Sequence, residues 1–305
     1  TGFLGIHILH SILQNSSAHI YCIIREKDNL NSIQRFYNKF EFYFGREELE
    51  KYKDRITTIT GNILKEKFGL STDSYDELGS LVDCVINSAA IVKHYGNYSD
   101  FYNTNVFATK QMVDFCIKYH AHFHYISTMS VSGYGLVECP DRTFTENDFY
   151  VGQKYKDNVY VNSKFEAENV VLSACKNNKL KASIYRIGNI TNRFSDGIFQ
   201  QNAGDNAFLN RITSIINLGN IPKEVMHHSL EFTPVDFCAD FIVKLLSLQE
   251  NNINVYHLYN DKYVSLHKLL TILQKYDINI KIVPMEKFEK EILSAPDKHF
   301  GITHY

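Results

Sequence analysis

The 305-residue sequence lacks the features that would direct it to a membrane or to nucleic acid. No apolar run approaches the roughly 18 residues that a membrane-spanning helix requires. Lysine and arginine total 32 against 34 aspartates and glutamates, and this formal net charge of -2 argues against a phosphate-binding basic face. No signal peptide is recognisable, although the start of the sequence looks cut. We therefore expect a cytoplasmic protein without a membrane or nucleic-acid partner.

The sequence also lacks the spacings of a disulfide framework or a metal site. The six cysteines form no CxxC pair, so free thiols in a reducing cytosol are expected. No HxxxH pair with a helper glutamate occurs among the 13 histidines, and we expect no metal. His120, His122 and His124 alternate along an expected strand, which favours surface histidines over zinc ligands. Repeats, low-complexity runs and flexible linkers are missing as well, which indicates one globular unit.

Short apolar segments alternate with amphipathic helical patterns over the first 190 residues. The expected strands are 19–26, 54–63, 82–90, 122–131 and 181–190, and the expected helices are 3–15, 31–44, 102–120 and 160–178. This alternation predicts a parallel sheet covered by helices on both faces. Right-handed crossovers then give a doubly wound, Rossmann-type α/β fold with ligands at the carboxyl ends of the strands.

The rhythm changes after residue 190, where a polar, asparagine-rich stretch begins. The expected elements there are helices near 205–217, 235–248 and 265–276 and a strand at 254–260. We assign 1–190 and 229–260 to a dinucleotide-binding domain, and 191–228 and 261–305 to a smaller C-terminal lobe that binds the substrate.

The opening segment "TGFLGIHIL" resembles part of a phosphate-binding turn. Gly2 and Gly5 begin an amphipathic helix, as where a backbone approaches a pyrophosphate, although a helix also begins with glycine for structural reasons alone. The strand and first glycine that precede such a turn are missing, so we expect the sequence to start inside the motif. Arg25, after the second expected strand, suits the 2′-phosphate of NADP, and Arg35 is a second candidate. The alternative is a pair of solvated surface arginines.

Ten segments carry a family resemblance over nearly the whole chain. They are "TGFLG", "CIIRE", "TGNI", "VINSAAIV", "NTNVFATKQMV", "YISTMSV", "FTEND", "YVNSKFEAE", "YRIGNI" and "FTPVDFCADFIV". In this order they resemble the extended short-chain dehydrogenase/reductases. More narrowly, they resemble the thioester reductase domains that end nonribosomal peptide synthetases, carboxylic acid reductases and aminoadipate reductases. Arg25, "STMSV" and "SKFEAE" favour this branch over the sugar-nucleotide epimerases.

The resemblance implies NADPH-dependent reduction of a carrier-bound acyl or peptidyl thioester to an aldehyde, with a further step to an alcohol left open. The implied partner is a phosphopantetheinylated carrier protein or domain. The implied cofactor-binding residues are Gly2, Phe3, Leu4, Gly5, Arg25, Arg35, Asn62, Ile63, Ser88, Ala89, Ala90, Val92, Asn105, Tyr160, Lys164, Ile187, Gly188 and Ile190. Two positions depart from the family pattern, since Asn62 stands where aspartate is usual and Ile187 replaces a proline beside the nicotinamide.

Some of these residues also have simpler explanations. Asn105 either orders Lys164 through water or caps local backbone. The small residues 88–90 either admit the cofactor or allow tight packing of a helix on a strand.

Tyr160 and Lys164 are four residues apart on an expected helix and therefore project to one side. A free phenol has a pKa near ~10, and a neighbouring ammonium is expected to lower it, so that Tyr160 protonates a carbonyl oxygen as general acid. Lys164 would also hold the nicotinamide ribose. Thr128, at the end of an expected strand, would donate to the same oxygen, with Ser127 as the alternative hydroxyl. Without the other motifs, a surface pair of Tyr160 and Lys164 would be the simpler interpretation.

Three other functions stay open at this stage. A fatty acyl-CoA reductase would share the chemistry, whereas a sugar-nucleotide epimerase or dehydratase would favour an acidic residue in place of Arg25. A non-catalytic NADP-binding regulatory or scaffold protein would keep the fold without turnover. The sequence leaves the acyl substrate, the oligomeric state and whatever precedes Thr1 undetermined.

Overall fold

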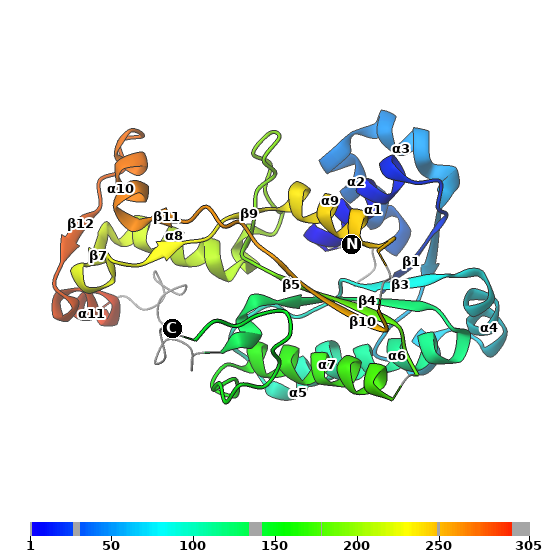
Figure 1. The fold of residues 1–305 in the computed structure, drawn as a ribbon. Helices are drawn as coiled ribbons and strands as arrows, with labels where there is room; N and C mark the ends of the chain where they lie inside the picture. Colours follow the sequence, from blue (N-terminus) through cyan, green and yellow to red (C-terminus); the bar gives the residue numbers. More distant parts are fainter. Residues whose placement is uncertain (1, 27–30, 134–141, 178, 249–250, 295–305) are drawn as a thin grey trace.

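A four-stranded parallel sheet forms the centre of the computed structural model, which describes residues 2–26, 31–133, 142–177, 179–248 and 251–294 (Figure 1). Its strands are β3 (Cys84–Asn87), β4 (His122–Thr128), β5 (Ala182–Ile187) and β10 (Ile253–Leu258), in the order β10-β5-β4-β3. A second parallel pair consists of β1 (Ile20–Ile24) and β2 (Ile56–Thr60). The register sets Thr128 opposite Ile187, so β4 and β5 end side by side.

Helices cover both faces of this sheet, as the sequence pattern predicts (Figure 1). One face carries α6 (Ala108–Tyr119) and α7 (Val159–Lys176), and the other carries α1 (Phe3–Asn15) and α9 (Val235–Leu245). Ala167 and Val171 of α7 pack with Phe123 of β4, whereas Ile8 of α1 packs with Ile126 on the opposite face. Asn158 begins α7 by accepting hydrogen bonds from the first backbone N–H groups of the helix.

The remaining elements of this body pack around its edges. They are α2 (Ser32–Phe44), α3 (Arg46–Tyr52), α4 (Thr72–Leu81), α5 (Tyr98–Phe101), the 3-10 turns Lys53–Arg55, Glu66–Gly69 and Met129–Ser132, and a π-helical turn, Tyr102–Phe107. The helices α3 and α4 were not among the expected elements. The described residues contain no helix that is both long and apolar enough to cross a bilayer.

The expectation of surface histidines on the 122–131 strand is wrong. His122 and His124 are buried, and their rings lie 4.4 Å apart. Strand β4 has neighbours on both edges and helices on both faces, so alternation cannot bring either ring to solvent. Burial lowers the pKa of His124 to about 3. Each ring has one hydrogen-bonding neighbour, Ser183 for His122 and Tyr185 for His124.

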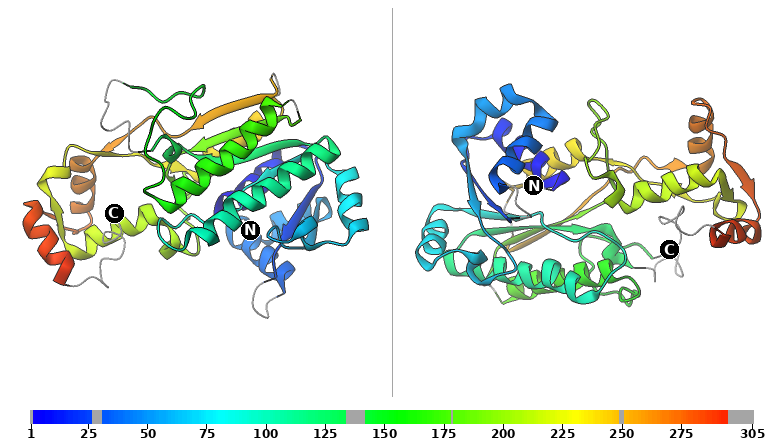
Figure 2. Two further views of the ribbon diagram at one scale, coloured as in Figure 1. Left: turned by 90° about the horizontal axis from the view of Figure 1, so that it is seen from below. Right: turned by 180° about the vertical axis from the view of Figure 1, so that it is seen from behind.

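A smaller lobe extends from the carboxyl end of the sheet (Figure 2). It contains α8 (Ala207–Leu218), β7 (Asn220–Pro222), β8 (Ser229–Leu230), β11 (Val264–Ser265), α10 (Leu266–Gln274), β12 (Lys281–Val283), α11 (Met285–Ser294) and 3-10 turns at Ala203–Asp205 and Lys223–Val225. The pair β6 (Ile190–Thr191) and β9 (Thr233–Pro234) joins it to the sheet. Ile221, Met226 and Leu266 form a small core of its own. The assignment of 191–228 and 261–305 to substrate binding stays a prediction, and 295–305 lie outside the described residues.

Candidate active site

Thr128 and Tyr160 are two of the expected catalytic residues, and the Thr128 hydroxyl, at the carboxyl end of β4, lies near enough to the Tyr160 phenol to influence its pKa. Successive side chains of a strand point to opposite faces, so Thr128 and Ser127 differ in surroundings. The hydroxyl of Ser127 is buried and donates to the Glu168 carboxylate at 2.7 Å. Thr128 instead reaches the pocket described below. The geometry therefore favours Thr128 over Ser127 as the hydroxyl that faces a substrate.

The expected lowering of the Tyr160 pKa is wrong for this structure. Burial raises the pKa of Tyr160 to about 12, and the nearby Thr128 hydroxyl only opposes that rise. Lys164 lies one helical turn further along α7, but its Nζ donates to the Ile126 carbonyl at 2.6 Å and lies 4.2 Å from the Tyr125 ring centroid. Burial lowers the pKa of Lys164 to about 7. Desolvation is the main cause of both shifts, since Lys164 is buried and Tyr160 is partly buried.

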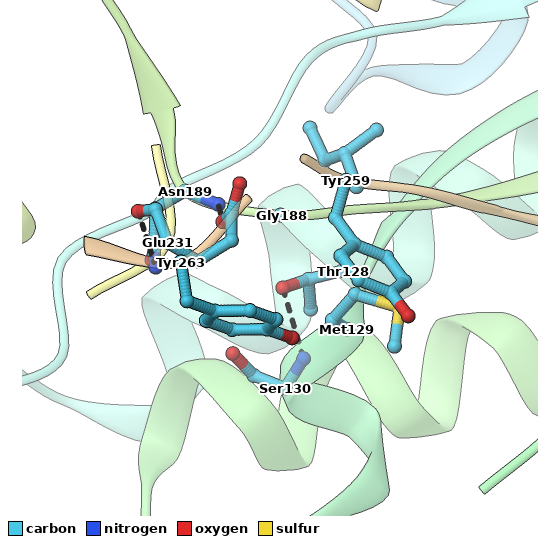
Figure 3. Close-up of a pocket in the computed structure, with 9 residues that line it drawn as sticks. Thr128, Met129, Ser130, Gly188, Asn189, Glu231, Tyr259 and Tyr263 are labelled. Carbon is cyan, nitrogen blue, oxygen red and sulfur yellow. Dashed lines mark hydrogen bonds between the residues drawn. The ribbon is translucent and has the colours of Figure 1, made fainter. Parts of the chain in front are cut away.

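A pocket of about 220 Å³ opens beside Thr128 (Figure 3). It is lined by Thr128, Met129, Ser130, Ile187, Gly188, Asn189, Glu231, Tyr259 and Tyr263. The rings of Tyr259 and Tyr263 lie on either side of Thr128, whose Oγ1 accepts a hydrogen bond from Ser130 N at 3.2 Å (Figure 3). The walls come from the ends of β4 and β5 and from the two segments that flank the smaller lobe. Ile187 was expected beside the nicotinamide and Gly188 among the cofactor-binding residues, whereas Glu231 and the two tyrosines were not singled out from the sequence.

The start of α1 approaches the end of β3 closely, as a glycine-rich turn requires. A Cβ atom on Gly5 would lie 2.7 Å from Ser88 Oγ, so a side chain there would require the Ser88 hydroxyl to move. Gly2 begins the helix without a side-chain cap and has open space around it. The ring of Phe3 is buried against Tyr43, so only the backbone of Phe3 remains for a ligand.

Two arginines concentrate positive charge after β1. Arg35 Nη2 donates to the Arg25 carbonyl at 2.6 Å, which brings the two residues together. Its Nη1 is buried and has no hydrogen-bond partner within the described residues. Burial and the nearby Arg35 charge lower the pKa of Lys39 on the same helix. Arg35 is therefore not a simply solvated side chain, although the side chain of Arg25 is exposed.

Asn105 is bound to the backbone of Ile91 and to the side chain of Ser163. Its Oδ1 accepts from Ile91 N at 2.9 Å, while its Nδ2 donates to Ile91 O at 3.0 Å and to Ser163 Oγ at 2.8 Å. These bonds fasten the segment after β3 to α7 and agree with the interpretation that Asn105 caps local backbone, while an ordering of Lys164 through water stays a prediction. Asn105 lies in the π-helical turn before α6, a geometry that often marks functional sites.

The other expected cofactor residues lie along the carboxyl edges of the strands. Asn62 follows β2, and its Oδ1 accepts from Leu64 N at 3.0 Å, which leaves a second lone pair for a ligand. Ser88, Ala89 and Val92 are exposed after β3, with Ala90 half-buried. Ile63 and Ile190 are half-buried and pack against the hydrophobic core. No group of His, Cys, Asp and Glu side chains suited to a metal ion occurs in the described ranges.

Comparison with known proteins identifies the family. Residues 1–242 match the family model described as "Male sterility protein", an NAD-binding family. The chain belongs to this family. The match spans β3, β4 and β5 of the central sheet, the turn at α1, and the Thr128, Tyr160 and Lys164 positions.

Relatives of this male sterility family member include large synthetases and reductases. The chain is 27% identical over 305 residues to a linear gramicidin synthase of Brevibacillus parabrevis, with 98% of this chain and 6% of that protein covered. It is 25% identical to the L-2-aminoadipate reductase of Eremothecium gossypii, with 98% of this chain and 22% of that protein covered. The chain thus spans less than a quarter of either relative.

A solved structure shares the whole fold. A thiolation-reductase di-domain from an archaeal nonribosomal peptide synthetase superposes with a TM-score of 0.87 and 31% identity, covering 99% of this chain and 64% of that one. The Rossmann-type fold expected from the sequence is confirmed, as is the resemblance to thioester reductase domains. The family member therefore has an NAD(P)-binding domain. Glu231 of the pocket immediately precedes "FTPVDFCADFIV", one of the segments that carry the resemblance.

Proposed function

We propose that this chain is an NADPH-dependent oxidoreductase that releases a carrier-bound acyl or peptidyl thioester as an aldehyde. The observation that carries the proposal is a pocket at the carboxyl ends of parallel strands that is lined by Thr128, whose hydroxyl lies near the Tyr160 phenol. The names of the relatives, a peptide synthetase and an aminoadipate reductase, support the same chemistry. Because the chain spans a small part of those proteins, their full activities are not transferred to it.

In the proposed reaction, Thr128 and Tyr160 hold the thioester carbonyl oxygen by hydrogen bonds. The bound dinucleotide supplies the hydride that reaches the carbonyl carbon. Tyr160 then gives its proton to the oxygen, which yields a hemithioacetal. Collapse breaks the carbon–sulfur bond, and the proton of the hemithioacetal hydroxyl leaves with the thiol. One hydride and one proton are consumed for each aldehyde and free thiol formed.

The raised pKa of Tyr160 suits this role. A phenol with a pKa of about 12 stays protonated at neutral pH, so the donor is ready in nearly every molecule. The alkoxide that forms from a carbonyl is more basic than a phenolate, so the proton moves to the substrate oxygen. Lys164 donates to the Ile126 carbonyl and so ties α7, which carries Tyr160, to β4, which carries Thr128. We propose it as a positioning residue.

The choice of NADPH rests on the arginines after β1. The buried Nη1 of Arg35 lacks a partner within the described residues, and the 2′-phosphate of NADP would satisfy it. The residues present therefore fit a phosphate-bearing dinucleotide, with Asn62 and the Gly2–Gly5 turn as further contacts. Titration with NADPH and NADH tests this. Arg35→Leu is expected to weaken NADPH roughly 10-fold or more and leave NADH unchanged, whereas the exposed control Arg46→Gln changes neither.

The proposed partner is a phosphopantetheinylated carrier protein or domain, with the smaller lobe of 191–228 and 261–305 receiving its arm. An aldehyde-forming reductase also needs reduced cofactor and a thiol product that stays reduced. The free thiols of the described cysteines agree with a reducing compartment, and we propose the cytoplasm.

Turnover tests the proposed function directly. Purified chain with NADPH and an acyl-pantetheine thioester, or a loaded carrier, is expected to consume cofactor and release aldehyde and thiol in equal amounts. Tyr160→Phe removes the proton donor and is expected to lower kcat roughly 100-fold to 10,000-fold. The control Tyr276→Phe alters a tyrosine that is 74% exposed and should have no effect. A fully active Tyr160→Phe variant would overturn the assignment.

A further inference from the structure

The pocket beside Thr128 has a polar lining in which the charged groups are of one sign. Its polar groups are the phenols of Tyr259 and Tyr263, two hydroxyls, the Asn189 amide and one carboxylate. None of its nine lining residues is a lysine or arginine. The carboxylate of Glu231 is therefore the charged group of the lining.

Glu231 is held in place by uncharged donors. Asn189 N donates to its Oε2, while Asn260 N, at 3.2 Å, and the Thr233 hydroxyl donate to its Oε1. Its side chain is only 9% exposed, so water screens it poorly. Neutral donors stabilise a carboxylate but leave its charge in place, and a buried charge attracts a cation strongly. Every donor that the described residues give to Glu231 is of this neutral kind.

The absence of a side chain at Gly188 leaves room for the Glu231 carboxylate at the pocket. A Cβ atom on residue 188 would collide with the Glu231 carboxylate and would lie 2.8 Å from Tyr259 Cβ, so only glycine fits there. Burial, with help from Tyr259, Glu231 and Asp261, raises the pKa of Tyr263 across the pocket. Lys262, the residue before Tyr263, is 84% exposed and pairs with Asp261. The pocket lining thus carries one carboxylate and no side-chain cation beside Thr128.

We propose that this pocket selects acyl groups that carry a protonated amine close to the thioester carbonyl, with Glu231 as the group that binds the ammonium. The substrates are then aminoacyl thioesters, or peptidyl thioesters with a basic group near the reacting end. The phenols of Tyr259 and Tyr263 accept further N–H hydrogen bonds from the same ammonium. This inference rests on the proposed thioester reduction and names its substrate class.

Isosteric substrate pairs test the inference on the unaltered protein. Alanyl-pantetheine is compared with isobutyryl-pantetheine, and β-alanyl-pantetheine with butyryl-pantetheine, so that an ammonium replaces a methyl group of similar size. The amine of at least one pair is expected to have the higher kcat/KM, by roughly 10-fold to 100-fold, as for a hydrogen bond between charged groups. Equal kcat/KM values within both pairs would refute the inference, whereas no NADPH consumption with any thioester would refute the proposed function instead.

A charge-neutral variant locates the preference. Glu231→Gln is expected to bring the kcat/KM values of the two members of the preferred pair within about 3-fold of each other, whatever its absolute turnover. Glu224→Gln removes an exposed carboxylate of the smaller lobe that pairs with Lys223, and it should keep the full preference. A preference that persists in Glu231→Gln would assign ammonium binding elsewhere. The result with unaltered protein stands even where Glu231→Gln fails to fold.

Discussion

The buried ion pair between Glu168 and Arg186 allows a demanding test of the structure. Both side chains are fully buried, and Arg186 donates from Nε and Nη2 to Glu168 Oε1. The other carboxylate oxygen accepts from Ser127, the residue before Thr128. Arg186 also donates to the carbonyls of Thr145 and Asp148. Glu168→Gln keeps the shape of the side chain but leaves the guanidinium without its counter-charge.

The expected loss of stability is large. Removing one partner of a buried pair typically costs about 3–5 kcal/mol because the other charge stays buried and unpaired. With an m-value of about 3 kcal/mol/M, the urea midpoint should fall by roughly 1–2 M. Replacing both partners, as in Glu168→Met with Arg186→Met, removes the unpaired charge and should recover part of the loss. Recovery stays incomplete because the Thr145 and Asp148 carbonyls lose a donor.

Urea unfolding followed by circular dichroism measures these shifts. Glu166→Gln is the matched control, since it lies on the same helix and accepts a hydrogen bond from the neutral hydroxyl of Tyr98 at 2.6 Å. An amide oxygen can accept that bond, so the control should lose less than about 1 kcal/mol. A Glu168→Gln midpoint as close to wild type as that of the control would refute the reasoning.

Three further expectations follow from the same structure. Gly188→Ala puts a Cβ against the pocket carboxylate and should reduce kcat/KM for every substrate while costing about 1–3 kcal/mol in urea unfolding. Asn105→Ala leaves the Ile91 N–H and carbonyl without partners and should lower the thermal midpoint by roughly 5 °C. Burial lowers the pKa of His7 to about 4 and of His124 to about 3, so between pH 6.5 and 4 the unfolded chain binds more protons than the folded one. Stability should therefore decrease as the pH is lowered, by roughly 4 kcal/mol between pH 7 and 5, and equal urea midpoints at those two values would contradict this.

The regular elements of the sheet could be predicted because their sequence patterns are local. The run 122–131 has the apolar character of a buried strand, and 160–178 has the length and small residues of a helix that packs on it. Both are present, as β4 and α7. The same run misled the prediction for His122 and His124, since alternation alone does not say that both faces of a strand are covered. That fact depends on helices distant in sequence.

Elements of the smaller lobe were harder to predict because their partners are remote. Strand β12 pairs with β7, some 60 residues earlier, and each strand has only three residues. Neither segment is long enough to show a period. Glu231 and Tyr263 share this difficulty, since they reach the pocket only because the chain returns to the sheet twice.

The site shows the limit of reasoning from spacing alone. The separation of Tyr160 and Lys164 correctly predicts one helix and one side of it, but it does not fix where the amine points. In the structure the amine is bound to the Ile126 carbonyl, and burial raises the pKa of the phenol rather than lowering it. Desolvation acts on each group separately and grows with depth, whereas attraction needs a short distance between the two.

This reversal changes what pH should do to the proposed reaction. With Tyr160 protonated at any pH well below 12, the phenol does not set the pH dependence of kcat/KM in the neutral range. Lys164, with a pKa of about 7, is the group of this pair that changes charge there. Its neutral form keeps N–H donors for the Ile126 carbonyl, so the tie between α7 and β4 survives deprotonation while its charge is lost. If kcat/KM shows an inflection near pH 7 that disappears in Lys164→Met, the inflection reports the charge of Lys164. An inflection of kcat/KM that persists in Lys164→Met would exclude Lys164 as its source.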